Sequence, residues 1–286
     1  MPFSSLGLGP NILKALQEAG YTEPTPIQAA AIPLITAGHD LIGIAQTGTG
    51  KTAAFVLPIL AKLVTLTGDS RPRTRVLVVA PTRELAAQIE ENVRAYAKHL
   101  PLRMATVFGG VGERPQIEAL RSGADLIIAT PGRLLDLMNQ RYGDFSALQF
   151  LVLDEADRML DMGFLPDIRR IVRAMPKKRQ TLLFSASLSQ EIETLTHEFL
   201  QSPKTVQIGR RANPAETVTQ LVYEVSQHLK PALLNHLLKD PAFDSVLIFS
   251  RTKHGAHRIA RNLESNRIKT STLHSNRSQY QRLRAL

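Results

Sequence analysis

The chain consists of short apolar runs separated by segments with the spacing of amphipathic helices. Several runs are apolar without alternation, which is typical of parallel strands that are covered on both faces. Alternating strands and helices predict an α/β fold, in which helices cover both faces of a parallel sheet. Seven strands are predicted in the first 208 residues, at positions 40–45, 75–80, 105–108, 125–129, 150–153, 180–184 and 205–208.

The segments between these runs carry helix signals. Residues 84–100 repeat an apolar position on each turn, which predicts one buried helix face. Thr25-Pro26 and Thr130-Pro131 each place a capping residue before a proline suited to the first helical position. In open parallel sheets, ligands bind beyond the carboxyl ends of the strands, so the candidate chemistry is sought in the loops that follow the apolar runs.

The pattern changes after residue 208. Residues 209–216 (GRRANPAE) lack periodicity and contain Gly, Pro and charged residues, which predicts a linker. We therefore expect a first domain at 1–208, a linker at 209–216 and the truncated start of a second α/β domain at 217–286. The second part is predicted to hold strands at 219–225, 245–250 and 269–274 and helices at 231–238, 254–265 and from about 278.

Composition narrows the class of protein. The 286 residues are 43% hydrophobic and 21% charged, as in ordinary globular proteins, and contain no cysteine. Disulfides, thiolate metal sites and a cysteine nucleophile are thereby excluded. The sequence contains neither an apolar run of membrane-spanning length nor a secretory signal, so we expect no membrane association and a cytoplasmic location.

The charge is uneven along the chain. The net charge is +10, and residues 207–286 carry 13 Lys and Arg against 5 Asp and Glu. A basic region of this kind suggests a polyanionic partner, although a solvated basic face is the alternative.

Residues 45–52 (AQTGTGKT) follow a predicted strand and open a predicted helix. This is the context of a phosphate-binding loop, in which glycines turn backbone N–H groups toward a phosphate. Lys51 is placed to reach the β- and γ-phosphates, and the Thr52 hydroxyl to help hold Mg²⁺. The general pattern begins with Gly, whereas this chain has Ala45. A glycine-rich turn beside a chance lysine is the alternative.

A second signal supports the first. The apolar run 150–153 ends in Asp154-Glu155-Ala156-Asp157, about a hundred residues after the lysine. One carboxylate at such a strand end can hold Mg²⁺, and its neighbour can orient or deprotonate a water. An acidic helix start is the alternative, because helix N-termini favour Asp and Glu.

The chain resembles the DEAD-box RNA helicases, and its overall sequence is most similar to their bacterial RhlE-like branch. Residues 154–157 spell the family name, and further family motifs occur in order along the whole chain. They are 20–28 (GYTEPTPIQ, the Q motif, with Phe3 upstream), 81–86 (PTRELA), 109–110 (GG), 130–133 (TPGR), 185–187 (SAS, usually SAT), 246–251 (motif IV) and 279–282 (QYQR).

The resemblance implies a RecA-like P-loop fold and an ATP-dependent helicase that unwinds short RNA duplexes. Gln28 would read the adenine edge, with Phe3 packed on the base. Asp154 and Thr52 would hold Mg²⁺, Asp154 through a water molecule, and Glu155 would activate the hydrolytic water. Catalysis is assigned to Glu155, Asp154 and Lys51. ATP binding is assigned to Phe3, Tyr21, Gln28, Gln46, Thr47, Gly48, Thr49, Gly50, Lys51 and Thr52.

Six further residues would lie on the RNA path and contact its backbone, with little sequence specificity. Helix caps and turns are the alternative reading for several of them. Ser185 and Ser187 would couple hydrolysis to domain closure. The RNA-path residues are Pro81, Thr82, Arg83, Gly110, Thr130 and Arg133.

The family's motifs V and VI, with arginines that reach the γ-phosphate, would follow residue 286. We therefore expect this chain to hydrolyse ATP weakly, if at all. Three alternatives stay open: an ATP-gated RNA clamp without unwinding, a P-loop ATPase that acts on protein or in transport, and a non-catalytic fragment that binds nucleotide. Protein partners and the RNA target are not indicated by the sequence.

Overall fold

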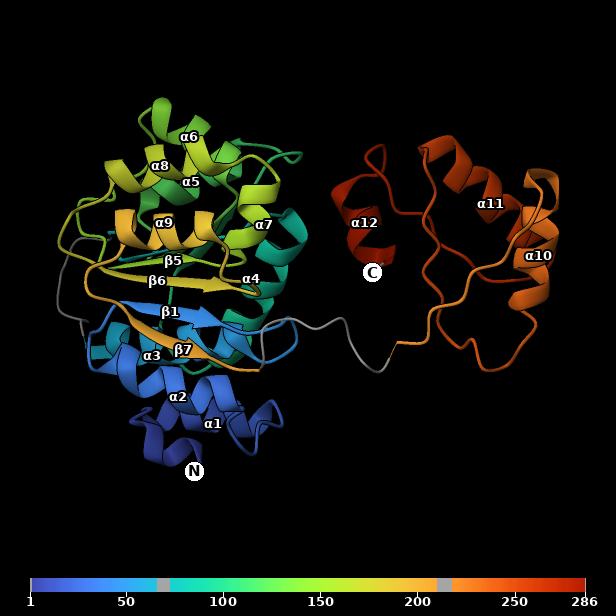
Figure 1. Cartoon of the computed structure of the whole chain (residues 1–286). Coiled ribbons are helices and arrows are strands. Elements are labelled where there is room, and N and C mark those ends of the chain that lie inside the picture. Colours follow the sequence, from blue (N-terminus) through green and yellow to red (C-terminus); the bar gives the residue numbers. More distant parts are fainter. Residues whose placement is uncertain (1, 66–72, 210–217, 286) are drawn as a thin grey trace. The chain divides into compact units, whose positions relative to one another are not determined.

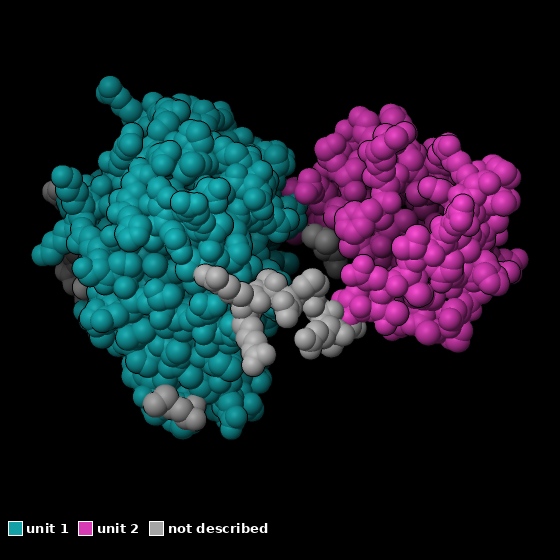
Figure 2. All heavy atoms as spheres, in the orientation of Figure 1, with its two compact units in different colours: residues 1–213 teal, residues 214–286 magenta. Residues whose placement is uncertain are grey.

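The computed structural model describes residues 2–65, 73–209 and 218–285. The chain divides into two units, Met1–Asn213 and Pro214–Leu286, which are coloured separately in Figure 2. Each unit is described by itself.

The apolar runs of the first unit form one sheet of seven parallel strands, in the order β3-β4-β2-β5-β6-β1-β7. Figure 1 labels four of them, β5, β6, β1 and β7, in this order across the sheet. All seven predicted strands are confirmed, with ends that agree within one residue. The strands are β1 (Leu41–Ile44), β2 (Val76–Val79), β3 (Met104–Val107), β4 (Leu126–Ala129), β5 (Phe150–Leu153), β6 (Gln180–Ser185) and β7 (Lys204–Gln207).

Helices cover both faces of this sheet, which explains why its strands are apolar throughout. Val76 and Val78 belong to the core shared with η1 and α1–α4, while Leu77 and Val79 belong to the core shared with α5–α9. The helical elements are η1 (Phe3–Leu6), α1 (Pro10–Glu18), α2 (Pro26–Thr36), α3 (Lys51–Thr65), α4 (Arg83–Tyr96), α5 (Arg114–Ser122), α6 (Pro131–Asn139), α7 (Ala156–Asp161), α8 (Leu165–Ala174) and α9 (Gln190–Phe199).

The predicted caps lie at the helix starts. Thr25 and Thr130 are the N-cap residues of α2 and α6, each followed by proline. The Thr82 hydroxyl accepts a hydrogen bond from the Leu85 amide at 3.2 Å and so caps α4. These helices begin at or near the carboxyl ends of the strands, the edge of the sheet where the candidate chemistry is expected.

The second unit has the predicted helices but not the predicted strands. The segments 219–225, 245–250 and 269–274 form no strand, so that part of the prediction is wrong. Their apolar side chains are largely exposed, 97% for Val222 and 89% for Phe249. A parallel ladder requires burial of both sheet faces, which the described part of this unit does not supply. Its helical elements are η2 (Gln227–Leu229), α10 (Lys230–Leu237), α11 (Lys253–Ser265) and α12 (Gln279–Ala285).

Among the described residues, no helix combines the length and the apolar character that crossing a membrane requires.

Candidate functional site

The carboxyl edge of the sheet gathers the residues that the sequence singled out. At this edge, the loop after β1 leads to Lys51 at the start of α3, Asp154 directly follows β5, and Ser185 is the last residue of β6. Strands β2 and β4 lead into those that carry Arg83 and Thr130. Because β2 pairs with β5, the two groups of loops are neighbours at one edge. The sheet order therefore places the predicted ATP residues beside the predicted RNA residues.

The loop between β1 and α3 has the form of a phosphate cradle. Gly48 and Gly50 adopt φ values of 81° and 91°, which L side chains rarely tolerate. The Thr49 hydroxyl donates to the Gln46 carbonyl at 2.7 Å and closes the turn. Gln46, Thr47 and Gly48 are exposed, and helix α3 begins at Lys51. The loop thus presents its backbone and a helix N-terminus to an incoming anion.

Gln28 joins the Q motif to this loop. Its side chain is 1% exposed. Its Nε2 donates to the Gly50 carbonyl at 3.1 Å, and its Oε1 accepts from the Thr25 amide at 3.0 Å. A Cβ on Gly50 would collide with Nε2, so both the glycine and the glutamine are required for this contact. The sequence identified Gln28 as an adenine reader, but it gave no sign of this direct contact with the phosphate loop.

Phe3, predicted to pack on the base, and Tyr21, predicted to bind ATP, lie in an aromatic cluster. Phe3 is 5% exposed and meets the Tyr21 ring edge-on at 6.4 Å between centroids. The Tyr21 hydroxyl lies 2.8 Å from that of Tyr96, a residue of α4. The N-terminal aromatic is therefore packed rather than loose, and its contact with a base stays a prediction.

Lys51 and Asp154 form the buried centre of the site. The Lys51 Nζ atom is buried without a hydrogen-bond partner among the described residues. Asp154 is 2% exposed, and burial raises its pKa to about 6, against the opposing effect of the Lys51 ammonium. A buried ammonium without a partner costs free energy unless an anion satisfies it. Lys51 and Asp154 together suit an anionic ligand that carries its own cation. The anion would pair with the buried ammonium, and the cation would pair with the buried carboxylate.

The raised pKa of Asp154 predicts a pH-dependent stability of the nucleotide-free protein. The folded state binds this proton more tightly than the unfolded chain, so the free energy of unfolding falls as the pH rises from about 4 through 6. Asp154→Asn removes that loss and is expected to raise stability at pH 7 by up to about 3 kcal/mol. Denaturant unfolding of both proteins across this pH range measures the difference.

The matched control is Asp161→Asn, which changes an exposed carboxylate at the end of α7, the helix that begins two residues after Asp154. The stability gained by Asp154→Asn should grow between pH 4 and 6, whereas that of the control should stay small. A gain that is constant with pH would show that Asp154 is not the titrating group.

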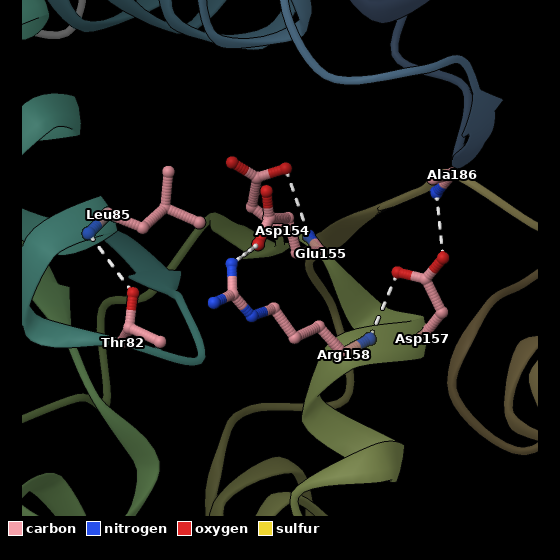
Figure 3. Close-up of polar contacts among 7 residues, drawn as sticks. All are labelled: Thr82, Leu85, Asp154, Glu155, Asp157, Arg158 and Ala186. Atoms are coloured by element: carbon pink, nitrogen blue, oxygen red, sulfur yellow. Dashed lines mark hydrogen bonds and ion pairs between the residues drawn. The ribbon is translucent and has the colours of Figure 1, made fainter. Parts of the chain in front are cut away.

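Glu155 has an unusual backbone and a nearby cation. Its φ of 51° is left-handed, a conformation that costs a non-glycine residue about 1–2 kcal/mol. Its side chain is 12% exposed, and its Oε2 lies 3.2 Å from Nη1 of Arg158 (Figure 3). The Glu155 amide donates to Asp154 Oδ1 at 3.0 Å. The turn therefore holds two adjacent carboxylates in different surroundings, one buried and one paired at the surface.

Asp157 is a residue whose structural role the sequence did not identify. Its Oδ2 accepts a hydrogen bond from the Ala186 amide at 3.0 Å (Figure 3). The same oxygen accepts from the Ser187 amide at 3.0 Å and from the Ser187 hydroxyl at 3.1 Å. The adjacent Ser185 carbonyl accepts from the Ala45 amide at 3.0 Å. The acidic motif, the Ser-Ala-Ser motif and the phosphate loop are thus joined by hydrogen bonds across β5, β6 and β1.

The predicted RNA-path residues also lie together. The Arg83 guanidinium occupies the space where a Cβ on Gly110 would be, and Gly110 has a φ of 77°. Arg133 Nη1 lies 3.5 Å from the Val111 carbonyl in the same loop. Pro81 precedes Thr82, and Thr130 is 8% exposed. Two guanidinium groups, from the first turns of α4 and α6, therefore lie at one loop, an arrangement suited to phosphate oxygens.

The donor set for a metal ion is incomplete without a ligand. Within residues 2–65, 73–209 and 218–285, no cluster of three His, Cys, Asp or Glu side chains could hold a metal ion by itself. Mg²⁺ commonly takes only one or two protein carboxylates, together with water and substrate phosphates. Asp154 and Thr52 fit that pattern, since a phosphate-bearing ligand in the adjoining loop would supply the remaining oxygens.

Comparison with known proteins agrees with this geometry. A profile of the DEAD/DEAH box helicase family matches residues 25–195. The ATP-dependent RNA helicase vasa of Drosophila melanogaster is 42% identical over 99% of this chain and 43% of its own length. The DEAD-box ATP-dependent RNA helicase CshA of Streptococcus pneumoniae is 38% identical over 100% of this chain and 54% of its own. The chain thus spans about half the length of these curated relatives.

A solved structure gives the same result for the fold. The crystal structure of a DEAD box protein from the hyperthermophile Methanococcus jannaschii matches with a TM-score of 0.68 and 32% identity. The match covers 99% of this chain and 76% of that one, which confirms the RecA-like fold. Sequence, fold and site together show that the chain belongs to the DEAD/DEAH box helicase family.

Proposed function

We propose that this chain is the ATP-binding part of an ATP-dependent RNA helicase, which unwinds short RNA duplexes locally. One observation carries the proposal: the paired strands β2 and β5 place the Arg83 loop directly beside the Asp154 loop. Nucleotide and RNA would then bind at one edge of one sheet. Family membership and the names of the relatives support this assignment.

ATP would bind across the loop that precedes α3. The backbone of residues 46–50 would receive the phosphates, the Lys51 ammonium would gain the partner that it lacks, and Gln28 would bind the adenine edge. Thr52 and Asp154 would hold Mg²⁺, which supplies charge neutralisation of the phosphates. The Glu155 carboxylate would orient the attacking water and accept its proton.

RNA would bind through its backbone. Arg83 and Arg133 supply positive charge, and the N-termini of α4 and α6 supply amide donors, so affinity would depend little on base sequence. Asp157, bonded to Ser187, would transmit the state of the nucleotide loop to the Ser-Ala-Ser motif.

Three finer assignments belong to the same proposal. Residues 1–208 would be the ATP-binding domain, 209–216 a linker, and 217–286 the start of the C-terminal helicase domain. The division of the described chain into two units supports this arrangement. The assignment to the bacterial RhlE-like branch rests on the sequences of the motifs alone. The relatives do not single out this branch, because they include an insect and a bacterial protein.

RNA binding is tested with variants of one helix. Arg83→Ala is expected to lower the affinity for labelled single-stranded RNA about fivefold to twentyfold. The slope of log K against log salt concentration is expected to become shallower by about one. Arg94→Ala is the matched control, because it lies in the last turn of the same helix and pairs with Glu90. Fluorescence anisotropy at several salt concentrations measures both.

The result distinguishes the proposal from its rivals. Equal losses for the two variants, or an affinity independent of salt, would contradict the assigned RNA path. ATP hydrolysis that RNA leaves unchanged would favour a P-loop ATPase of another kind. RNA binding gated by ATP without displacement of a short duplex would favour a clamp.

A further inference from the structure

A second concave region lies at the edge of the sheet opposite the proposed nucleotide site. It is formed by the residues before β2 and by the loops before β4, β5 and β6. Because the strands are parallel, their amino ends share one edge and their carboxyl ends the other. Each strand has four to six residues, so roughly 13–20 Å of sheet separates the two edges. Two cavities open here, and they share Gly143 and Asp144 as a common wall.

The smaller cavity, of about 260 Å³, is lined by three arginines: Arg73, Arg121 and Arg141. The Arg121 guanidinium lies over the Tyr142 ring, 4.8 Å from its centroid, which restrains its orientation. Among the described residues of the lining, the only acidic one is Asp144, whose Oδ1 accepts from the Ser146 amide at 2.9 Å. Three guanidinium groups against one carboxylate leave a cavity suited to anionic groups.

Arg141 is presented by a fixed backbone. It follows α6 with a φ of 63°, where glycine is the usual residue, and its amide donates to the Met138 carbonyl at 2.9 Å. The Tyr142 amide donates to the Leu137 carbonyl at 3.0 Å, which completes a Schellman-type helix end. The conformation is available to glycine without strain, so the guanidinium can be removed without disturbing the turn.

The larger cavity, of about 510 Å³, is mainly apolar. Met138, Phe145, Met175 and Pro176 contribute to its lining, together with Tyr142. Methionine side chains are flexible and adapt to varied apolar partners. An extended ligand that crosses Gly143 could therefore place an acidic group among the arginines and an apolar group among these side chains.

The chemistry favours a peptide over single-stranded RNA. RNA bases stack on free aromatic faces, but Phe145 is 7% exposed and one face of Tyr142 is covered by Arg121. RNA would use the arginines and leave the apolar cavity empty. A peptide with acidic and apolar side chains matches both cavities through charge complementarity and apolar burial.

We propose that the paired cavities around Gly143 and Asp144 bind a partner protein through an extended segment that carries a carboxylate side chain beside a bulky apolar one. The carboxylate pairs with Arg141 and Arg121, and the apolar side chain enters the cavity lined by Met138 and Met175. The ATP-binding loop is not part of this surface, so binding of the segment and binding of nucleotide are separable.

The test uses the full 286-residue chain and a panel of short fluorescein-labelled peptides. Each peptide holds a glutamate pair at a varied spacing from a phenylalanine or leucine. At least one is expected to bind with a micromolar Kd by anisotropy, and its counterpart with lysines in place of the glutamates is not. Arg141→Gly is expected to weaken this binding about tenfold, as loss of a charge-assisted contact does. Arg267→Gly is the matched control, because Arg267 also has a left-handed φ, 64°.

Two further measurements separate a binding role from a structural one. Arg141→Gly should leave the affinity for a fluorescent ATP analogue unchanged and should not lower Tm, since glycine suits this backbone. Asp144→Asn keeps the Oδ1 acceptor for Ser146 and should tighten binding of the acidic peptide severalfold.

Three outcomes would overturn the proposal: no peptide of the panel binds, Arg141→Gly and Arg267→Gly have equal effects, or labelled single-stranded RNA binds and loses affinity on Arg141→Gly while the peptides do not bind. The last outcome would assign the arginines to RNA.

Discussion

Lys51→Ala is expected to weaken ATP binding severely while leaving the nucleotide-free fold at least as stable. The Lys51 Nζ atom is buried without a hydrogen-bond partner in the described chain, so the empty site gains nothing from the ammonium beyond its attraction to Asp154. With ATP bound, the same ammonium would bind phosphate oxygens away from solvent. Removing one partner of such a pair costs about 2–5 kcal/mol, or roughly 30-fold to several thousandfold in affinity.

Titration with a fluorescent ATP analogue measures the loss, and thermal unfolding with and without nucleotide gives an independent value. The wild-type Tm should rise with ATP, because a ligand that binds only the native state stabilises it, whereas the variant's Tm should not. Lys62→Ala is the control, since Lys62 lies in the last turn of the same helix. Unchanged affinity in the Lys51 variant would remove the phosphate-loop assignment altogether.

The seven strands of the first unit were predictable because parallel strands buried on two faces need apolar side chains at every position. Val76–Val79 shows this directly, since alternate residues enter the cores on opposite sides of the sheet. The same rule failed in the second unit. Residues 245–250 are as apolar as a buried strand, yet Leu247 is 76% exposed and no ladder forms there. A run of apolar residues gives a strand only where neighbours cover it.

The sequence predicted which residues gather at the carboxyl edge of the sheet, but not the hydrogen bonds between them. Lys51 and Asp154 could be singled out because a phosphate-binding loop is expected to have particular residues at fixed spacing after a strand. No local sequence pattern specifies the order of the strands across the sheet. The bonds from Asp157 to the Ser-Ala-Ser segment depend on β5 lying beside β6, and the bond from Gln28 to Gly50 depends on the packing of α2 against the loop.

Glu155→Gln is expected to keep ATP binding and to lower whatever ATP turnover the chain shows above the Lys51→Ala blank by up to about 100-fold to 10,000-fold, the usual contribution of a general base. Glutamine has nearly the same shape and can still accept a hydrogen bond from Arg158, so the turn at φ 51° is preserved. It has no carboxylate to accept a proton from the attacking water. The chemical step is therefore lost while the contacts to phosphate through Lys51 remain.

Arg158→Ala separates catalysis from the structural role of the Glu155–Arg158 pair. The pair is 3.2 Å long and Arg158 is 57% exposed, and exposed pairs contribute only about 0–1 kcal/mol. We expect Arg158→Ala to change turnover by only a few-fold, measured against Lys51→Ala as the blank. If instead Arg158→Ala were as damaging as Glu155→Gln, the glutamate would be acting through the ion pair. If Glu155→Gln retained normal turnover above that blank, the water would be activated by another group.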